Sequence, residues 1–381
     1  MFAPSILTIL GIILFLRLGF VVGDSGLLNA LLMIGLGTSV SVLTSISLAA
    51  IATNIQVGGG GVYYLISRTL GVEFGGAIGI VLYLAQTVSI AFYAVGFGEA
   101  LSGMTGWTVW WGPQLIAAAA VLVLFVFVWA GTDVANRFQF VVMAILVSAL
   151  ISFFAGAIGS YDPGVASEGL LPAPDSLGFW VVFAIFFPAV TGFTQGVAMS
   201  GDLRDPGRSL PKGTFYAVGI STFVYVSAVI LMAGSASQHT LQVDGRVMRT
   251  ISGFGPLIDA GVIAATLSSA MASFLGAPRI LQALAVDRVF PLLRPFAAVH
   301  GPANNPRAGV VLSLIIALAT IGLGSLNVIA PVVSMFFLIS YGLLNYATYY
   351  EARAMSPSFR PRFRFFSRRA SLVGAAACLG A

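Results

Sequence analysis

The stretch that decides the fold is GFWVVFAIFFPAVTGFTQGVAMSGDLRDPGRSLPKGT, at residues 178–214. Its apolar run carries Pro188, Thr191 and Gly192 near the middle and ends in a dense charged segment. Proline removes a backbone donor and clashes with the preceding turn, so the pattern predicts a helix that breaks at Pro188. A broken helix is tolerated within hydrocarbon only where it is buried in protein or lines a cavity. Its ends then present carbonyl groups to cations and amide groups to anions.

The composition identifies a membrane protein. Hydrophobic residues make up 58% of the 381 residues and charged residues only 8%, whereas a soluble domain is about 25% charged. The mean hydropathy is +0.99. A single cysteine, Cys378, excludes an internal disulfide, and the two histidines, His239 and His300, lie far apart. We therefore expect neither a histidine metal site nor a cofactor. No nucleophile–base set appears at one depth, so we do not expect an enzyme.

Ten apolar segments approach the ~20 residues that a membrane span requires. They lie at 5–22, 28–53, 75–101, 109–130, 138–159, 179–200, 213–234, 257–283, 308–328 and 330–350. We expect an all-α integral membrane protein in three parts. These parts are a ten-helix transporter core over residues 1–350, a basic cytoplasmic segment over 351–369, and the start of a truncated eleventh helix over 370–381.

The basic residues are distributed unevenly between the loops. With a cytoplasmic N-terminus, fifteen of the eighteen Lys and Arg residues fall in cytoplasmic loops. The opposite side holds only Arg246 and Arg249, and Arg17 lies within the first span. This asymmetry follows the positive-inside rule. We therefore expect a multi-pass protein of the cell membrane with a cytoplasmic N-terminus. The lipid bilayer explains the basic balance, and nucleic acid is not an expected partner.

Two spans look interrupted. Besides 179–200, the first span carries Pro4, Thr8 and Gly11 in an otherwise aliphatic run. These are the first and sixth spans, so they hold equivalent places in two five-span halves. Broken segments at corresponding positions of two halves indicate a transporter's binding site at the membrane midplane.

The residue types near these breaks indicate the substrate. Among the carboxylates only Glu99 and Asp259 approach a span, and both sit near its end, whereas hydroxyls and backbone carbonyls are available between them. A cation buried among neutral oxygens needs a counter-charge nearby. Half-helices that start at Gly11 and Gly192 would offer free amides to an anion. The residues therefore predict a carrier that moves cations and small anions together.

Several long motifs, in order along the chain, resemble one known family. They are GIILFLR (11–17), AIATN (50–54), GGGGVYYLISRTLGVEFGGAIG (58–79), AFYAVGFGE (91–99), FAIFFPAVTG (183–192), SGDLRDP (200–206), ATLSSAMAS (265–273), GAPRILQALAVDRVFP (276–291) and FFLISYGLLNYA (336–347). Over nearly its whole length the chain resembles the cation–chloride cotransporters. The resemblance implies the LeuT-type 5+5 inverted repeat of the amino acid–polyamine–organocation superfamily, with broken first and sixth helices.

The resemblance also implies the ion sites, residue by residue. Potassium would be held by Thr8, Ile9, Tyr93, Pro188 and Thr191. One chloride would lie on the amides of Gly11, Ile12 and Ile13, and a second on those of Gly192, Phe193 and Thr194, with Tyr341. Sodium would be held by Leu7, Leu10, Ala265, Ser268 and Ser269. Asp202 and Arg279 form a candidate gate pair, Asp202 in an expected cytoplasmic turn at 200–213.

Two features favour the sodium-dependent branch of this family. Members that bind sodium keep the pair matching Ser268 and Ser269, and members that bind potassium keep the tyrosine matching Tyr93. Together they predict an electroneutral symporter that moves Cl⁻ with Na⁺ and K⁺. The alternatives are a potassium–chloride or sodium–chloride symporter, an amino acid permease of the same fold, and an anion channel or non-transporting scaffold. Thr8 stands where the family usually has asparagine, which leaves potassium transport open, and a homodimer stays an option.

Overall fold

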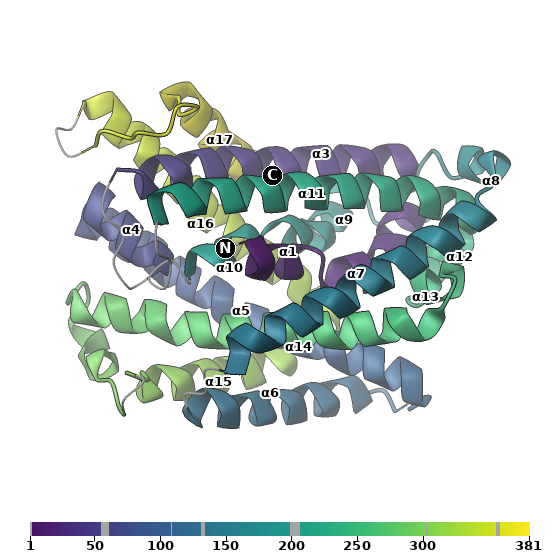
Figure 1. Cartoon of the computed structure of the whole chain (residues 1–381), viewed down its shortest axis with the longest axis horizontal. Coiled ribbons are helices and arrows are strands. Elements are labelled where there is room, and N and C mark those ends of the chain that lie inside the picture. Colours follow the sequence, from purple (N-terminus) through teal and green to yellow (C-terminus); the bar gives the residue numbers. More distant parts are fainter. Residues whose placement is uncertain are drawn as a thin grey trace.

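The structure of the protein is a computed structural model that describes residues 2–54, 61–107, 109–130, 134–198, 206–301, 304–355 and 359–381. Within these residues the only β-type pairing is an isolated bridge between His300 and Asn305. The long helices run side by side along one direction, and shorter helices lie in the middle and at both ends (Figure 1). The fold is therefore all-α, as the sequence predicts.

Seven helices of the described residues are long and apolar enough to cross a membrane. They are α3 (Leu18–Ala52), α5 (Val72–Thr105), α6 (Gly112–Ala130), α7 (Val134–Ser160), α11 (Pro206–Ser235), α14 (Gly255–Val286) and α16 (Leu326–Ala354). A further apolar helix, α15 (Arg307–Ile321), is shorter. Short connecting helices are α4 (Gly61–Leu70), α8 (Pro163–Glu168), α12 (Gln238–Val243), α13 (Val247–Ile251) and η3 (Pro291–Ala297). The chain ends in α17 (Arg368–Gly380).

The first predicted span is broken in the structure. It consists of α1 (Phe2–Ile9), an unwound step at Leu10 and Gly11, and α2 (Ile12–Leu16), after which the helix continues as the start of α3. Gly26 then adopts φ +76°, a left-handed conformation that interrupts α3. A Cβ at this position would collide with the backbone of Leu171, so only glycine fits. The first part of α3 therefore completes the first span, and the rest forms the second.

The sixth predicted span is broken as well. It consists of α9 (Phe179–Phe186), the tight turn η1 (Phe187–Val190) and α10 (Phe193–Ala198). Pro188 lies at the start of η1, where its missing amide donor is least costly. Both breaks fall where the sequence predicts them. The expected turn at 200–213 is wrong in part, because α11 already begins at Pro206, whose fixed φ suits the first position of a helix.

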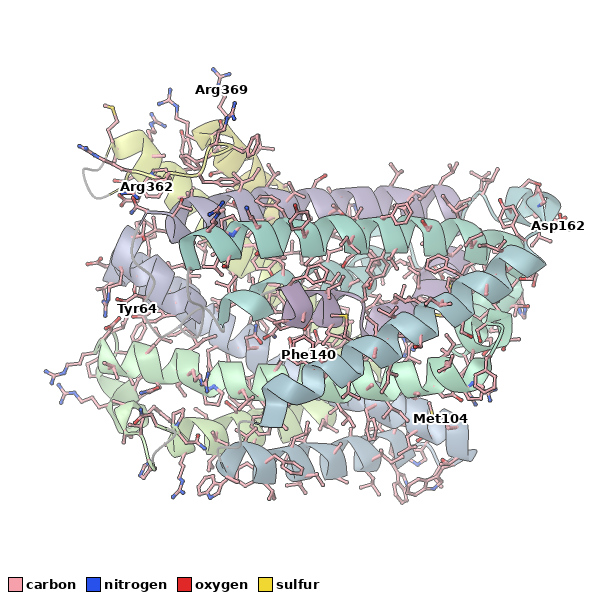
Figure 2. All side chains as sticks on the ribbon, viewed as in Figure 1. Tyr64, Met104, Phe140, Asp162, Arg362 and Arg369 are labelled. Carbon is pink, nitrogen blue, oxygen red and sulfur yellow. The ribbon has the colours of Figure 1, made fainter. Side chains whose placement is uncertain are left out.

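The two ends of the helix bundle differ in charge. Arg362 and Arg369 lie at the end that also carries α4 and η3, whereas Asp162 lies at the opposite end, beside α8 (Figure 2). We call the first the basic end. The opposite end carries α12 and α13; Arg246 directly precedes α13 and Arg249 lies within it. The positions of these arginines at the two ends of the bundle agree with the charge asymmetry that the sequence pattern predicts.

The C-terminal helix α17 packs against α16 and α3 through buried polar side chains. Ser47 on α3 donates to Asn345 Oδ1 on α16 at 2.6 Å and lies 2.8 Å from the Ser371 hydroxyl on α17. Asn345 Nδ2 donates to Thr44 Oγ1 at 2.9 Å. Polar groups buried in this way rigidify the packing because each has a partner. The network fixes α16, which runs past both breaks.

Candidate functional site

The two breaks meet at Gly192. A Cβ added to Gly192 would lie 2.8 Å from the backbone nitrogen of Ile9 and 2.8 Å from Cβ and Cγ2 of Thr8. These distances are shorter than an ordinary van der Waals contact, so glycine is required for the approach. The last turn of α1 and the unwound step before α10 are therefore in direct contact. The predicted potassium and chloride residues of both segments share one small region.

Hydroxyl groups from neighbouring helices satisfy carbonyls that the breaks release. Tyr225 on α11 donates to the Ile9 carbonyl at 2.8 Å, and Tyr341 on α16 donates to the Thr191 carbonyl at 2.8 Å. Ser41 on α3 donates to the Val190 carbonyl at 2.7 Å. Each carbonyl oxygen has two lone pairs, so one acceptor direction stays available on the Ile9 and Val190 carbonyls. The Thr191 carbonyl accepts a second hydrogen bond, from Thr194 Oγ1 at 3.3 Å. The freed backbone is thus held in place while it keeps capacity to bind a cation.

Unlike these carbonyls, the amides at the starts of α2 and α10 have no hydrogen-bond partner among the described residues. Among the described residues, no acceptor takes a hydrogen bond from the amides of Gly11, Ile12 and Ile13. The same holds for the amides of Gly192, Phe193 and Thr194. All six residues are buried. Buried amides without an acceptor are rare in proteins, and two groups of three at helix starts have the chemistry of anion sites.

The predicted potassium residues gather around the contact between the breaks. Thr8 Oγ1 donates to the Pro4 carbonyl at 2.9 Å, and Thr191 Oγ1 donates to the Pro188 carbonyl at 2.9 Å. Both hydroxyl oxygens keep lone pairs for a cation. Thr8 stands where the family usually has asparagine. Its hydroxyl is hydrogen-bonded within α1, and its Cβ and Cγ2 atoms lie against Gly192. The backbone carbonyl of Thr8 is unaffected by this choice of side chain.

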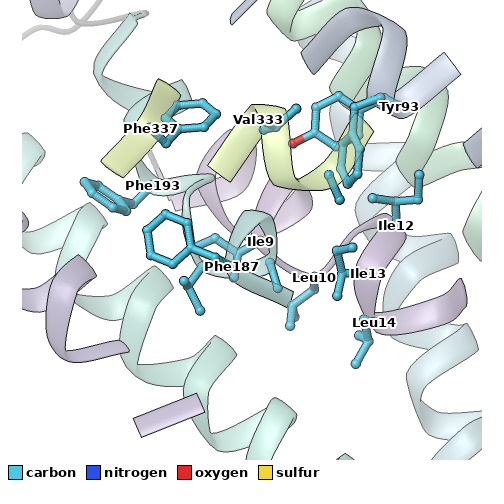
Figure 3. Close-up of a cluster of buried hydrophobic side chains, with 14 of the residues drawn as sticks. Ile9, Leu10, Ile12, Ile13, Leu14, Tyr93, Phe187, Phe193, Val333 and Phe337 are labelled. Atoms are coloured by element: carbon cyan, nitrogen blue, oxygen red, sulfur yellow. The ribbon is translucent and has the colours of Figure 1, made fainter. Parts of the chain in front are cut away.

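Tyr93 belongs to the same cluster. It projects from α5 among the side chains of the first break, with Ile9, Leu10, Ile12 and Ile13 nearby (Figure 3). Tyr93 is 4% exposed, and among the described residues its hydroxyl makes no hydrogen bond. A buried phenol normally finds a partner. The free hydroxyl is therefore a candidate ligand that the protein alone does not satisfy.

The hydroxyl of Tyr341 is not placed as a chloride ligand, which is the role that the resemblance implies. Its ring packs against Phe193, with 5.2 Å between the ring centroids. Its one hydroxyl proton points to the Thr191 carbonyl. A phenol has a single proton to donate, so the hydroxyl cannot donate to an anion in this arrangement. To contact chloride, it must rotate away from Thr191.

The predicted sodium residues come from α1 and α14, which pack against each other. Leu7, Leu10 and Ala265 are buried. The hydroxyl of Ser269 is buried and has no hydrogen-bond partner among the described residues. Ser268 is only partly buried. A buried hydroxyl without a partner is costly, so Ser269 is the member of this set whose position most clearly requires a ligand.

The candidate gate pair stays untested. Asp202 lies outside the described residues, and Arg279 is exposed on α14 without an ion pair to any described residue. Sequence reasoning missed a different pair. Arg17 bridges to Glu99 at 2.5 Å and donates to Asn327 at 2.6 Å, while Glu99 also accepts from the Leu326 amide at 2.9 Å.

This charged cluster links α2, α5 and the start of α16 on the side of the breaks away from the basic end. Its side chains are only 13% and 21% exposed for Arg17 and Glu99. A charge within an apolar span is itself a signal of function, so the sequence marked Arg17, but its pairing with Glu99 depends on the approach of α2 and α5. Tyr225 carried no such signal, since a tyrosine in an apolar run more often packs as an aromatic residue.

Comparisons with known proteins concern the family and the fold of the chain. A sequence profile of the amino acid permease family matches residues 1–381. The chain is 39% identical to solute carrier family 12 member 2 of Squalus acanthias, over 98% of this chain and 36% of that protein. It is 37% identical to solute carrier family 12 member 1 of Mus musculus, over 98% of this chain and 39% of that protein. The chain thus spans well under half the length of these curated relatives.

Among solved structures the chain resembles Mhp1, a nucleobase-cation-symport-1 family transporter in a closed conformation with bromovinylhydantoin bound. The TM-score is 0.57 at 14% identity, over 99% of this chain and 90% of that one. At this identity the likeness concerns the fold, and it confirms the predicted LeuT-type architecture. The relatives among the solute carriers confirm the resemblance of this chain to the cation–chloride cotransporters.

Proposed function

Because the chain belongs to the amino acid permease family, we propose that it is a secondary transporter that carries chloride with sodium and potassium by alternating access. The observation that carries the proposal is the pairing of two unlike sets of backbone groups where the broken segments meet. Amides without acceptors lie beside carbonyls and hydroxyls that retain free lone pairs. Such a region suits anions and cations bound together.

Chloride fits the amide groups because a halide needs donors and no acceptors. One chloride would lie on the amides of Gly11, Ile12 and Ile13, and the other on those of Gly192, Phe193 and Thr194. Each group stands at the start of a short helical segment, where the peptide dipole favours negative charge. The short α2 and α10 segments are buried, so water does not screen this attraction.

The cations would lie on oxygen atoms at the same breaks. The carbonyls of Thr8, Ile9 and Pro188, with the hydroxyls of Thr191 and Tyr93, would hold potassium. The carbonyls of Leu7, Leu10 and Ala265, with the hydroxyls of Ser268 and Ser269, would hold sodium. None of these ligands carries charge, so each cation would depend on a nearby chloride for charge balance. This mutual dependence is the physical basis of the proposed coupling.

One sodium, one potassium and two chlorides sum to zero charge, so the proposed cycle is electroneutral. Moving one net charge would add about 2.3 kcal/mol for each 100 mV of membrane potential. We propose the basic end as the cytoplasmic end, which places the N-terminus in the cytoplasm, because positive loops stay inside. The Arg17–Glu99 pair would then close the extracellular side.

An amino acid substrate is the alternative of the same fold, and the name of the matching family gives it weight. Its carboxylate and side chain need a cavity between α2 and α5. The two helices touch at Gly96, because Ile12 packs so closely on Gly96 that a Cβ on Gly96 would collide with Cδ1 of Ile12. The packing therefore supports small inorganic ions over an organic substrate.

Uptake of labelled chloride and rubidium into proteoliposomes tests the proposal. Rubidium stands in for potassium. We expect chloride uptake to need both sodium and rubidium or potassium outside, and to proceed without a current. Tyr93→Phe should weaken the response to rubidium more than the response to sodium, since it removes one potassium ligand and no sodium ligand.

Three outcomes separate the alternatives. Chloride uptake that ignores sodium favours a potassium–chloride symporter, and uptake that ignores rubidium favours a sodium–chloride symporter. Saturable uptake of an amino acid in place of chloride favours the permease. A current that scales with chloride flux would contradict the electroneutral stoichiometry.

A further inference from the structure

Three uncharged polar side chains form a buried cluster on the basic side of the breaks. Gln195 Nε2 on α10 donates to Gln86 Oε1 on α5 at 2.7 Å and to Ser273 Oγ on α14 at 3.1 Å. These residues are 4%, 3% and 0% exposed, respectively. We call Gln86, Gln195 and Ser273 the amide cluster. It joins three helices that are distant in sequence.

The amide cluster lies directly beneath the proposed ion ligands. Gln86 precedes Tyr93 by seven residues, which places it on the same face of α5 about 10 Å nearer the basic end. Ser273 follows Ser269 by four residues, one turn further along the same face of α14. In the sixth span, Gln195 follows Thr191 by four residues. Each member of the amide cluster thus lies one or two turns along its own span from a proposed ligand.

The three helices differ in continuity. The α10 segment is a six-residue piece of the broken sixth span, whereas α5 and α14 are unbroken over more than thirty residues each. The α5 and α14 helices also pack along each other. Hinge motions take place at loops and at the ends of elements, such as the break before α10, and not within long packed helices. Gln195 therefore joins a segment that can move to a pair that cannot.

We propose that the amide cluster is a gate on the basic side of the ion pathway, with Gln195 as the moving part. The inference rests on the proposed function, because only a transporter by alternating access needs such a gate. When α10 tilts, both hydrogen bonds from Gln195 break. The oxygen atoms of Gln86 and Ser273 then lose their donor and face the departing cations.

A second closure lies beyond the amide cluster toward the basic end. Gly79 precedes Gln86 by another seven residues, and a Cβ there would lie 2.7 Å from the ring of Tyr63 on α4. Tyr63 donates to Asp287 at the end of α14 at 2.8 Å, and Arg68 donates to the same carboxylate at 2.8 Å. Burial raises the pKa of Tyr63, so its hydroxyl stays protonated and keeps donating. The amide cluster is thus the inner of two stacked contacts on one face of α5.

The gate contains no charged side chain, unlike the Arg17–Glu99 pair on the other side of the breaks. Hydrogen bonds between neutral groups change little with ionic strength, whereas an ion pair with access to water is screened by salt. The amide cluster and the Arg17–Glu99 pair therefore respond differently to salt. High salt should loosen the Arg17–Glu99 pair and leave the hydrogen bonds of the amide cluster in place.

Accessibility of a cysteine between the gate and the ion sites tests the inference. Ser89 follows Gln86 by three residues and precedes Tyr93 by four, so it lies on the same face. Ser89→Cys would be placed in the full chain with Cys378→Ser, which removes the one native thiol. A membrane-impermeant methanethiosulfonate is applied to the basic side of membrane vesicles. Gln195→Met keeps the side-chain length but removes both hydrogen bonds. We expect the cysteine at position 89 to be labelled about tenfold faster in this variant than in the parent with Gln195, which corresponds to about 1.4 kcal/mol in the free energy of opening.

Three comparisons make the outcome decisive. Ser273→Ala removes one hydrogen bond and should raise the labelling rate less than Gln195→Met does. Gln86→Met combined with Gln195→Met should label little faster than Gln195→Met alone, because the two residues share a contact. Gln114→Met, on α6, should label like the parent. An unchanged rate in Gln195→Met overturns the gate even if sodium-dependent chloride uptake is present. Faster labelling in a chain that transports no chloride keeps the gate and overturns the proposed function instead.

Discussion

The contact at Gly192 gives the sharpest prediction. Gly192→Ala places a methyl group 2.8 Å from Ile9 N and from two carbon atoms of Thr8. Because the shortest ordinary contact is about 3.4 Å, the end of α1 and the start of α10 must separate by roughly 0.6 Å or more. Overpacking of this kind costs about 1–3 kcal/mol.

The larger effect concerns ion binding, because the proposed ligands lie on both sides of this contact. Binding groups need placement within about 0.5 Å, and a misplacement near 1 Å costs up to about 100-fold. We therefore expect the chloride and rubidium concentrations for half-maximal uptake to rise about ten- to hundredfold. The assay is the concentration dependence of uptake into proteoliposomes, together with thermal unfolding of the purified protein.

Gly219→Ala is the matched control. Gly219 lies on α11, and a Cβ there meets nothing within 4 Å. Replacing an exposed glycine within a helix should stabilise the protein by up to about 1 kcal/mol and leave uptake unchanged. If Gly192→Ala transports with the parent's ion affinities, the two breaks do not form one site, and the reasoning fails.

The remaining predictions concern single contacts around the breaks. Ser269→Ala should leave the protein equally or more stable without sodium, because it removes a buried hydroxyl without a partner, yet abolish stabilisation by sodium in thermal unfolding; loss of stability without sodium would argue for a packing role. Tyr225→Phe should weaken rubidium-dependent uptake about fivefold, since the Ile9 carbonyl loses its donor; an unchanged rubidium response would exclude Ile9 as a ligand. Arg17→Gln should destabilise the protein more than the double variant with Glu99→Gln, because the single change leaves a poorly solvated carboxylate; additive losses would mean that the pair is not coupled.

The sequence predicts the breaks well because proline and glycine act locally. Pro188 stops a helix wherever it stands in one, so its consequence is readable without knowing the neighbours. Gly11 and Gly192 mark the helix starts for the same reason. Gly26 lies in the gap between the predicted spans 5–22 and 28–53, but the close approach of Leu171, which is distant in sequence, could not be predicted.

The contacts between helices could not be predicted from periodicity. Tyr225 and Tyr341 are tyrosines in apolar runs, and nothing local shows that their hydroxyls reach the carbonyls of Ile9 and Thr191. The hydroxyl direction of Tyr341 even departs from the role that the resemblance implies. Such contacts depend on the relative rotation of packed helices, which sequence spacing leaves undetermined.

Polar residues within apolar segments gave a partial signal. Arg17 and Glu99 stood out because charges are costly in a span, but their pairing required the approach of α2 and α5. Gln86 and Gln195 are neutral and drew no attention, although a buried amide is satisfied only by a specific partner. A search for amides on the same helical face as a proposed ligand would have found Gln86 beneath Tyr93.

The most direct test of the central claim is anomalous diffraction from crystals grown in bromide and rubidium in place of chloride and potassium. The account predicts bromide peaks against the amides of Gly11–Ile13 and Gly192–Thr194, with a rubidium peak between them near Tyr93. Peaks elsewhere in the protein, in a sample that still transports both ions, would contradict the claim that the broken helices hold the ions by their backbone groups.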